Sequence, residues 1–294
     1  MDESRVIRSL KTQIGDWIFV IICALIAIIC LLPMVNLLAR SLSGTDYLVR
    51  HEVYLWPKGW NFGAYKTVLS DAKYIRAFIW TAILTVMCTF LSLFMTTVCA
   101  YPLMFEKLRG RGFFNIVITI TMFFSAGTIP NYLLMKSLHL LNNPLVLMVP
   151  YCLSVYNMII MRSFFYGIPD SLRESAEIDG ASFFRILWSI YLPLSKPVIA
   201  TLALFYAVGR WNGYSDALMY MKDKNYYPLQ LLLYNILNNV NSVEVATQEG
   251  FSAPGLAESL KAAIVMFSTI PILCIYPFLQ KYFIHGVTLG AVKE

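Results

Sequence analysis

Two groups of polar side chains lie among long apolar segments, and they are the residues of this sequence that can do chemistry. The first group is the stretch "RESAEIDGASFFRILWSIYLPLSKP", residues 173–197, which is charged and has helical spacing. The second group, "RWN" at 210–212 together with Asn157, lies inside apolar runs. Polar groups inside a membrane helix are costly, so they usually mark a transport pathway or a contact with a partner. Both groups must be positioned by the apolar elements around them.

The apolar residues gather in blocks that are long enough to cross a membrane. The chain has 294 residues, of which 58% are hydrophobic and 14% are charged, whereas a soluble domain has about a quarter charged residues. A transmembrane helix needs about 20 mostly apolar residues. Six blocks meet this requirement: 17–39, 77–103, 113–134, 144–165, 198–220 and 260–283. The sequence therefore predicts an all-α membrane protein with six transmembrane helices.

The positions of basic residues predict the orientation of these helices. The first apolar run exceeds the about 7–15 residues of a signal-peptide core, so 17–39 is interpreted as a retained first helix. Basic residues enrich cytoplasmic loops, and the short loop 104–112 holds Lys107, Arg109 and Arg111. Residues 1–16 and 284–294 are then cytoplasmic, so both termini lie inside. The segment 40–76 is predicted to be a folded external loop, and 77–283 to be the core with helices 2–6.

The sequence does not support a phosphate-loop ATPase, a metalloenzyme or a nucleic-acid-binding protein. It contains no GxxxxGK[ST] phosphate loop and no HExxH metal motif, and its six cysteines all fall within apolar blocks. Such cysteines are expected to be packing residues. The net charge of +6 is explained largely by basic cytoplasmic loops, so no nucleic-acid partner is expected. We expect a transport subunit that is not itself an enzyme.

The charged stretch between the fourth and fifth apolar blocks predicts a helix–turn–helix. Ser171 and Glu174 have the spacing of a capping box, and Asp179-Gly180 predicts the end of that helix. A second helix follows with one apolar stripe, and Pro193 and Pro197 are expected to break it before the fifth span. By pattern alone, an amphipathic hairpin lying on lipid is an alternative.

The spacing within this stretch resembles the EAA-loop signature of ABC importer permeases. The match runs Glu174-Ser175-Ala176, three residues, Gly180, nine residues, Ile190, one residue, then Leu192-Pro193, with serine replacing the first alanine. The segments "FYAVGRWNGYSDAL" (205–218) and "IYPFLQKYFIHGVTLGAVKE" (275–294) also resemble the carbohydrate-uptake branch of that family. Within it, the chain is most similar to permeases for oligosaccharides and polysaccharide fragments.

This resemblance implies a type I importer in the bacterial cytoplasmic membrane. Two permease subunits form the pore, two ATPase subunits bind below them, and an external solute-binding protein delivers an oligosaccharide. The second permease is expected to be a different chain. No cofactor is expected on this chain, because ATP and magnesium belong to the ATPase. The residues of the EAA loop (170–197) implied at the ATPase contact are Glu174, Ser175, Ala176, Glu177, Asp179 and Gly180.

The intramembrane polar residues predict where cargo passes. In this interpretation Trp211 stacks on a pyranose ring, Arg210 and Asn212 bond its oxygens, and Asn157 lines the same pathway. Arg210 would suit a cargo with carboxylates, such as a uronic-acid oligosaccharide, because charge-assisted bonds are strong. Alternatively, Arg210 pairs with Asp216 or braces the interface with the partner permease, and cargo charge is then irrelevant to it.

Other functions compete with sugar import. An ABC permease for a non-sugar solute is the nearest alternative. An ion-coupled secondary transporter could use Arg210 and Asp216, but it has no need for an EAA loop. An accessory or sensor protein could use the hairpin only to recruit a partner. Transport in liposomes with and without an ATPase subunit distinguishes these classes.

Overall fold

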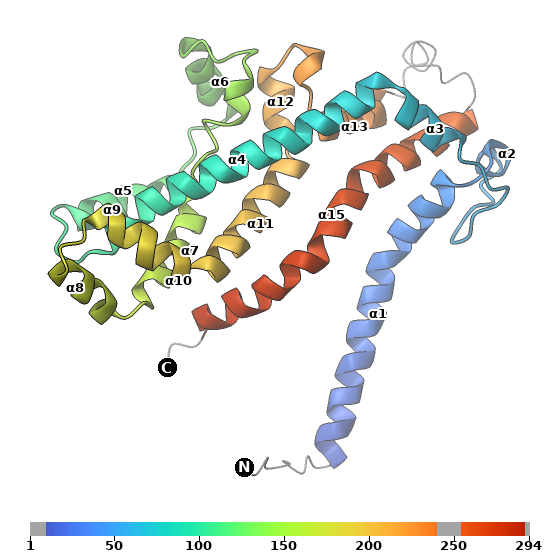
Figure 1. Ribbon diagram of the computed structural model, residues 1–294. Coiled ribbons are helices and arrows are strands. Elements are labelled where there is room, and N and C mark those ends of the chain that lie inside the picture. Colours follow the sequence, from blue (N-terminus) through green and yellow to red (C-terminus); the bar gives the residue numbers. More distant parts are fainter. Residues whose placement is uncertain (1–9, 240–253, 292–294) are drawn as a thin grey trace. The chain divides into compact units, whose positions relative to one another are not determined.

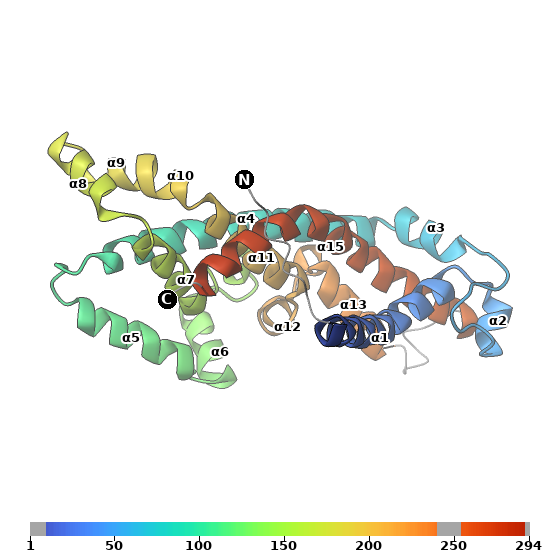
Figure 2. The same cartoon turned by 90° about the horizontal axis from the view of Figure 1, so that it is seen from below.

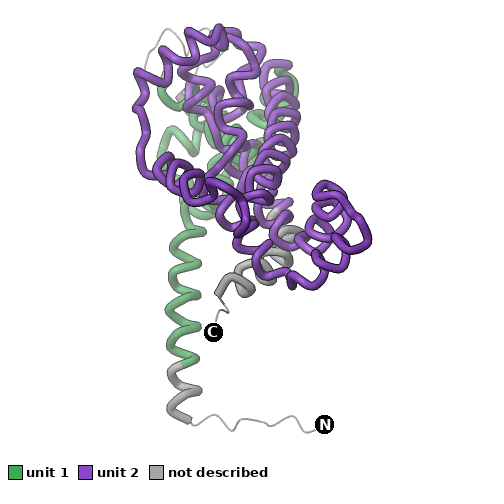
Figure 3. The backbone as a smooth tube through the Cα atoms, turned by 90° about the vertical axis from the view of Figure 1, so that its left-hand side faces the viewer, with its two compact units in different colours: residues 1–71, 236–267 green, residues 72–235, 268–294 purple. Residues whose placement is uncertain are grey.

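The computed structural model describes residues 10–239 and 254–291, and within these ranges all regular structure is helical (Figure 1). The chain divides into two compact units (Figure 3). Unit 1 comprises residues 1–71 and 236–267, and unit 2 comprises residues 72–235 and 268–294. The predicted all-α class is therefore confirmed for the described part of the chain.

Unit 1 contains a long exposed helix followed by a folded segment. Its helices are α1 (Leu10–Ser41), α2 (Thr45–Val49), α3 (Gly63–Ser70) and the first part of α15 (Pro254–Ala291). The apolar side chains of α1 are largely exposed, for example Trp17 at 69%, which is the surface expected of a helix that meets lipid or a partner. The segment after α1 is held by Ser43, whose Oγ accepts from Lys58 N at 3.1 Å, and Arg40 pairs with Glu258 at 2.7 Å.

Unit 2 is built around the long helix α4. Its elements in chain order are α4 (Ala72–Met104), α5 (Arg111–Phe123), α6 (Thr128–Ser137), η1 (Pro144–Leu147), α7 (Val155–Tyr166), α8 (Asp170–Ile178), α9 (Phe183–Ile186), η2 (Leu187–Tyr191), α10 (Leu192–Leu194), α11 (Lys196–Asn212), α12 (Ser215–Tyr220), η3 (Lys224–Tyr226) and α13 (Leu229–Asn239), whose last residues belong to unit 1. Helix α4 packs against both α7 and α11. The core between these helices includes Ala100, Met158, Met161, Phe165 and Leu202, all at most 1% exposed.

Three of the six predicted spans are single helices that can cross a membrane. They are Asp16–Ser41, Ala72–Met104 and Gly255–Ile275. Two further candidates are bent pairs, α5 with α6 at 115° and the segment Phe183–Leu194 with α11 at 82°. The described residues thus hold three to five candidate spans, and the count of six remains a prediction.

The expectation of continuous helices over 113–134, 144–165 and 198–220 is wrong. The first is interrupted after Phe123 and resumes at Thr128, beyond Gly127. The second begins with the short 3-10 helix η1 and becomes α-helical only at Val155, where α7 starts, because Pro144 and Pro150 lie in its first half. The third stops at Asn212 and continues as α12. The length of an apolar run does not reveal such breaks, because glycine and proline residues at a helix break are tolerated within membrane segments.

A helix–turn–helix occupies residues 170–194, and two details of its sequence interpretation need correction. The capping box is absent: Pro169 is the N-cap of α8, so Ser171 lies inside the first turn. The second helix continues through Pro193 and breaks at Ser195. Asp170 already places a negative charge in the first turn of α8, where it suits the helix dipole, so the helix begins before the serine.

Candidate functional site

The end of α8 is shaped by the glycine that the sequence singled out. Gly180 has a φ of +78°, a conformation that favours glycine. Gly180 N donates to Glu177 O at 3.0 Å, and Ala181 N donates to Ala176 O at 2.9 Å. This pair of bonds is the Schellman motif. Helix α8 therefore stops sharply at Asp179, its C-cap, and the chain turns back toward α9.

Ion pairs along α8 tie most of its charged side chains to one another. Arg173 Nη1 lies 2.7 Å from Glu177 Oε1, and Arg173 Nε lies 3.3 Å from Asp170 Oδ1. The hydrogen bond to Glu177 raises the pKa of the Arg173 guanidinium above its ordinary value. Glu174 is 3.9 Å from Arg173 and its side chain is 65% exposed. Of the two glutamates among the residues implied at the ATPase contact, Glu174 is the more exposed.

The remaining residues of α8 include two with small side chains, Ser175 and Ala176, and an exposed apolar residue, Ile178. Ser175 Oγ donates to Ser171 O at 2.9 Å, so the serine adds little beyond the volume of alanine. Ala176 packs against the core of unit 2. Ile178 is 86% exposed and was missed by the sequence analysis. An isoleucine at the end of the mostly polar segment DSLRESAEI was the signal in the sequence that could have indicated a contact residue.

The second half of the hairpin fixes α8 to the core of unit 2. Ile186, Leu187 and Tyr191 are buried there, and Tyr101 of α4 donates from its hydroxyl to Phe183 O at 3.1 Å. The Arg173 guanidinium lies 5.8 Å from the centre of the Phe105 ring, a cation–π distance. Figure 2 shows the hairpin projecting beside the end of α4, apart from α5. A displacement of the hairpin would therefore act on Tyr101 of α4 and on Phe105, the residue that follows α4.

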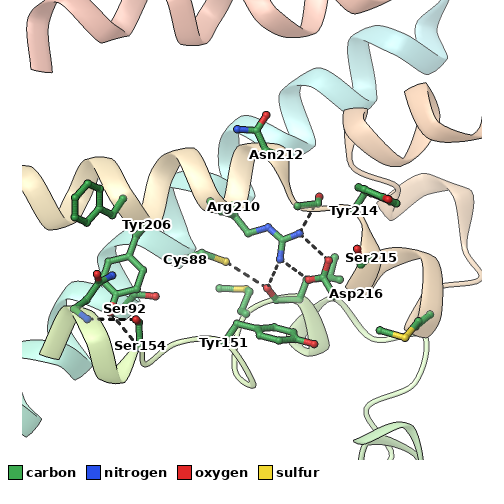
Figure 4. A pocket seen from close by; sticks show the side chains of 17 residues that line it. Cys88, Ser92, Tyr151, Ser154, Tyr206, Arg210, Asn212, Tyr214, Ser215 and Asp216 are labelled. Atoms are coloured by element: carbon green, nitrogen blue, oxygen red, sulfur yellow. Dashed lines mark hydrogen bonds and ion pairs between the residues drawn. The ribbon is translucent and has the colours of Figure 1, made fainter. Parts of the chain in front are cut away.

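A cavity of about 510 Å³ lies within unit 2. It is lined from α4, the segment after η1, α7, α11 and α12 (Figure 4). Hydroxyl and amide groups dominate the polar part of its wall, which comprises Ser92, Tyr151, Ser154, Asn157, Tyr206, Asn212, Tyr214 and Ser215. Arg210 and Asp216 are the charged residues among the described lining. The cavity has the mixed aromatic and polar wall typical of a small-molecule site.

Arg210 and Asp216 form a buried bidentate ion pair in the wall of this cavity. The two guanidinium nitrogens lie 2.5 Å and 3.0 Å from the two carboxylate oxygens, and both side chains are 9% exposed. Arg210 also donates to Leu147 O at 3.1 Å and to Gly213 O at 3.2 Å. A Cβ on Gly213 would lie 2.9 Å from Nη2, so glycine permits this approach. The pair joins α11, α12 and η1.

The structure places two of the four predicted pathway residues in the wall beside Arg210. Asn157 and Asn212 both line the cavity, and Asn212 donates to Val208 O at 2.9 Å. Asn157 is 6% exposed, at the start of α7. These two side chains come from different helices, and the sequence could not show that they meet.

Trp211, predicted to stack on a pyranose ring, lies outside the wall of this cavity. Its indole N–H donates to Ser268 O at 3.0 Å, and its ring meets Phe78 edge-on at 5.7 Å. Trp211 is 8% exposed and does not line the cavity. Successive residues of a helix point about 100° apart, so three consecutive side chains cannot all face one cavity.

Six polar residues of the wall were not predicted from the sequence. They are Ser92, Tyr151, Ser154, Tyr206, Tyr214 and Ser215. Tyr206 links the helices, because its hydroxyl lies 2.6 Å from Thr96 Oγ1 and accepts from Ser154 N at 3.2 Å. A signal was present for α4: Thr85, Thr89, Ser92 and Thr96 repeat every three or four residues, which is one helix face.

Known proteins resemble this chain over nearly its whole length. Residues 88–289 match the family described as "Binding-protein-dependent transport system inner membrane component". Protein LplC of Bacillus subtilis (strain 168) is 39% identical over 267 residues, 90% of each chain. The polygalacturonan/rhamnogalacturonan transport system permease protein YtcP of the same bacterium is 36% identical over 285 residues, 97% of this chain and 100% of the relative.

A solved structure agrees with these relatives. The crystal structure of a bacterial ABC transporter involved in the import of the acidic polysaccharide alginate contains a chain with a TM-score of 0.87 and 33% identity. The match covers 94% of this chain and 99% of that one. The chain thus belongs to the inner membrane components of binding-protein-dependent transport systems, with a type I permease fold. The resemblance to the carbohydrate-uptake branch of ABC importer permeases is confirmed.

Proposed function

We propose that this chain forms half of the translocation pathway of an ATP-driven importer for oligosaccharides. A solute-binding protein outside the membrane delivers the sugar, and a second permease chain supplies the other half. The observation that carries this proposal is the cavity with its hydroxyl and amide wall, which is lined in part by α4, α7 and α11, the helices whose buried residues also anchor the α8–α10 hairpin. A sugar presents many hydroxyl groups, so such a wall suits it.

The hairpin supports coupling to a separate ATPase. Helix α8 is capped by a Schellman turn and braced by ion pairs, so it can transmit a push as a rigid body. Glu174, Ser175, Ala176, Glu177, Asp179 and Gly180 are the proposed contact residues. Two ATPase subunits would bind ATP and magnesium, and this chain would carry neither. Glu174 is the carboxylate most available to a basic residue of the ATPase, because it is exposed and only distantly paired.

The cargo class follows from the relatives. YtcP is named for transport of polygalacturonan and rhamnogalacturonan, and the similar solved transporter imports the acidic polysaccharide alginate. We therefore infer that the cargo is an oligosaccharide containing uronic acids. The carboxylates of such a cargo need a recognition site on one of the subunits or on the binding protein.

Uptake by the purified complex tests this function. Proteoliposomes would contain this chain, its partner permease and the ATPase subunits, with the binding protein and labelled oligogalacturonide outside. We expect uptake that requires ATP inside, the binding protein and the ATPase subunits together. Uptake by this chain without the ATPase would instead support a secondary transporter, and no ATP-dependent uptake of any oligosaccharide would contradict the cargo assignment.

The proposed topology places both termini and the hairpin in the cytoplasm and the folded segment 40–76 outside. Single cysteines at Lys58 and Glu177 test it, because both side chains are substantially exposed, at 49% and 40%. We expect a membrane-impermeant maleimide to label position 58 in intact cells, and position 177 only after the membrane is opened. Labelling of position 177 from outside would overturn the orientation and the docking of α8 together.

A further inference from the structure

We propose that this chain contacts its cargo through uncharged groups, chiefly Asn157 and Ser92 with the ring of Tyr151, and that Arg210 is a positioning residue which does not touch cargo. This inference rests on the proposed function of the cavity as the sugar pathway. It assigns the recognition of cargo carboxylates to another subunit or to the binding protein.

The hydrogen-bond donors of Arg210 are already committed. A guanidinium has five N–H donors, and the terminal nitrogens of Arg210 meet both Asp216 oxygens and the carbonyls of Leu147 and Gly213. The remaining donor, Nε, is buried and has no partner among the described residues. Four of the five donors are thus committed, the fifth is buried, and the charge of the side chain is compensated by Asp216.

Asn157 and Ser92, unlike the terminal nitrogens of Arg210, have side-chain hydrogen-bonding groups that are not used within the described residues. Both line the cavity and are nine-tenths or more buried, with exposures of 6% and 3%. Within the described residues, neither side chain forms a hydrogen bond. The backbone N–H of Asn157 donates to Ser154 Oγ at 3.4 Å in the first turn of α7. This bond fixes the backbone position from which the Asn157 side chain extends. Buried amides and hydroxyls normally find a partner, and a sugar hydroxyl entering the cavity can be both donor and acceptor.

Tyr151 supplies the flat apolar surface that Trp211 does not. It lines the same cavity, and it is 51% exposed. In Figure 4 its ring lies along the cavity wall below the Arg210–Asp216 pair, while Ser92 and Ser154 lie further along with Tyr206. An exposed aromatic face beside uncharged hydrogen-bonding groups suits the two faces of a pyranose, which are apolar in the middle and polar at the edge.

Arg210 and Asp216 act together on the shape of the cavity. They hold the break between α11 and α12 at Gly213 and attach it to the carbonyl of Leu147. Loss of one partner leaves the other charged and buried, whereas loss of both charges removes that penalty. This difference allows a bracing role to be separated from a cargo contact.

The experiment uses the reconstituted complex with the binding protein and labelled oligogalacturonide, and it compares Asn157→Ala, Arg210→Gln, the double variant Arg210→Gln/Asp216→Asn and the control Ser137→Ala. Ser137 is exposed on α6, outside the cavity. We expect Asn157→Ala to assemble normally and to lower uptake about tenfold, the loss expected for one hydrogen bond. Arg210→Gln should prevent assembly of the complex. The double variant should regain assembly, with transport within about threefold of that of the unmodified chain.

Several outcomes would overturn the inference. A double variant that assembles without transporting would make Arg210 a cargo ligand, and one that fails to assemble would show that removing both charges does not relieve the defect. Full uptake by Asn157→Ala would remove Asn157 from the pathway. Failure of the proposed function is distinguishable, because the unmodified complex would then show no ATP-dependent uptake of the sugar.

Discussion

Arg173 on α8 and Arg210 on α11 both pair with carboxylates close in sequence, but they do so in different surroundings. The Arg173 side chain is 20% exposed and shares its charge among Asp170, Glu174 and Glu177, which are 40–73% exposed. Arg210 and its one carboxylate partner, Asp216, are each 9% exposed. Water can replace either partner at α8, whereas it cannot readily do so inside the cavity wall.

The comparison separates two uses of charge in one permease. At the hairpin, the charged side chains keep the surface hydrated and accessible to another subunit. Their ion pairs with one another keep α8 ordered. In the cavity, a matched pair holds three segments together without leaving a net charge in the pathway. Under the proposed function, the same residue type therefore supports a contact with the ATPase in one region and the shape of the cavity in the other.

Removing the carboxylate partner of each arginine is the strongest test of this difference. Asp216→Ala leaves the Arg210 guanidinium buried without a counter-charge, and we expect the complex to lose about 3–5 kcal/mol of stability. Asp170→Ala, its control at the hairpin, should cost under about 1 kcal/mol. Thermal unfolding of the purified complex measures both, and equal losses would contradict the comparison.

A side chain at the turn after α8 should have the next largest effect. Gly180→Val forces a β-branched residue into a φ of +78°, at a cost of about 1–3 kcal/mol. We expect the chain to insert normally and to lose co-purification with the ATPase. Gly112→Val is a suitable control, because an added Cβ meets no atom within 4 Å at either glycine, whereas only Gly180 of the two has a positive φ. Normal ATPase binding by Gly180→Val would show that the turn is not needed for docking.

Arg173→Gln tests the exposed network itself. It removes the pairs with Asp170 and Glu177 and the contact with the Phe105 ring, and we expect a loss of about 0.5–1 kcal/mol. ATPase activity stimulated by the loaded binding protein should fall more than stability does, because α8 would lose its contact with Phe105, the residue that follows α4. Stability and stimulation that both remain unchanged would remove Arg173 from the coupling pathway.

Glu174→Lys should have the smallest effect on the fold and a large one on assembly. The side chain is 65% exposed, so reversal of its charge should leave thermal unfolding within about 0.5 kcal/mol of the original. A basic ATPase groove would repel the lysine, and we expect reduced co-purification and uptake. Glu106→Lys, on the exposed loop after α4, is the control. Full uptake by the Glu174 variant would contradict the proposed contact.

The sequence by itself determined the membrane class, the family and the position of the hairpin. Apolar block length predicted the single helices α1, α4 and α15, because crossing a bilayer requires an uninterrupted apolar run. The helix stop at Gly180 was also readable, since few other residues adopt its backbone conformation. The spacing around Glu174 pointed to the permease family, which the relatives confirm.

Only the tertiary structure decided which polar groups share a cavity. Asn157, Ser92 and Arg210 are far apart in sequence, and their meeting depends on how α4, α7 and α11 pack. The sequence left open whether Arg210 pairs with Asp216, because that pair forms only when the chain breaks at Gly213 and turns back. The packing of Trp211 away from the cavity has the same origin: a run of residues along a helix does not say which side faces the core, and packing settles that choice.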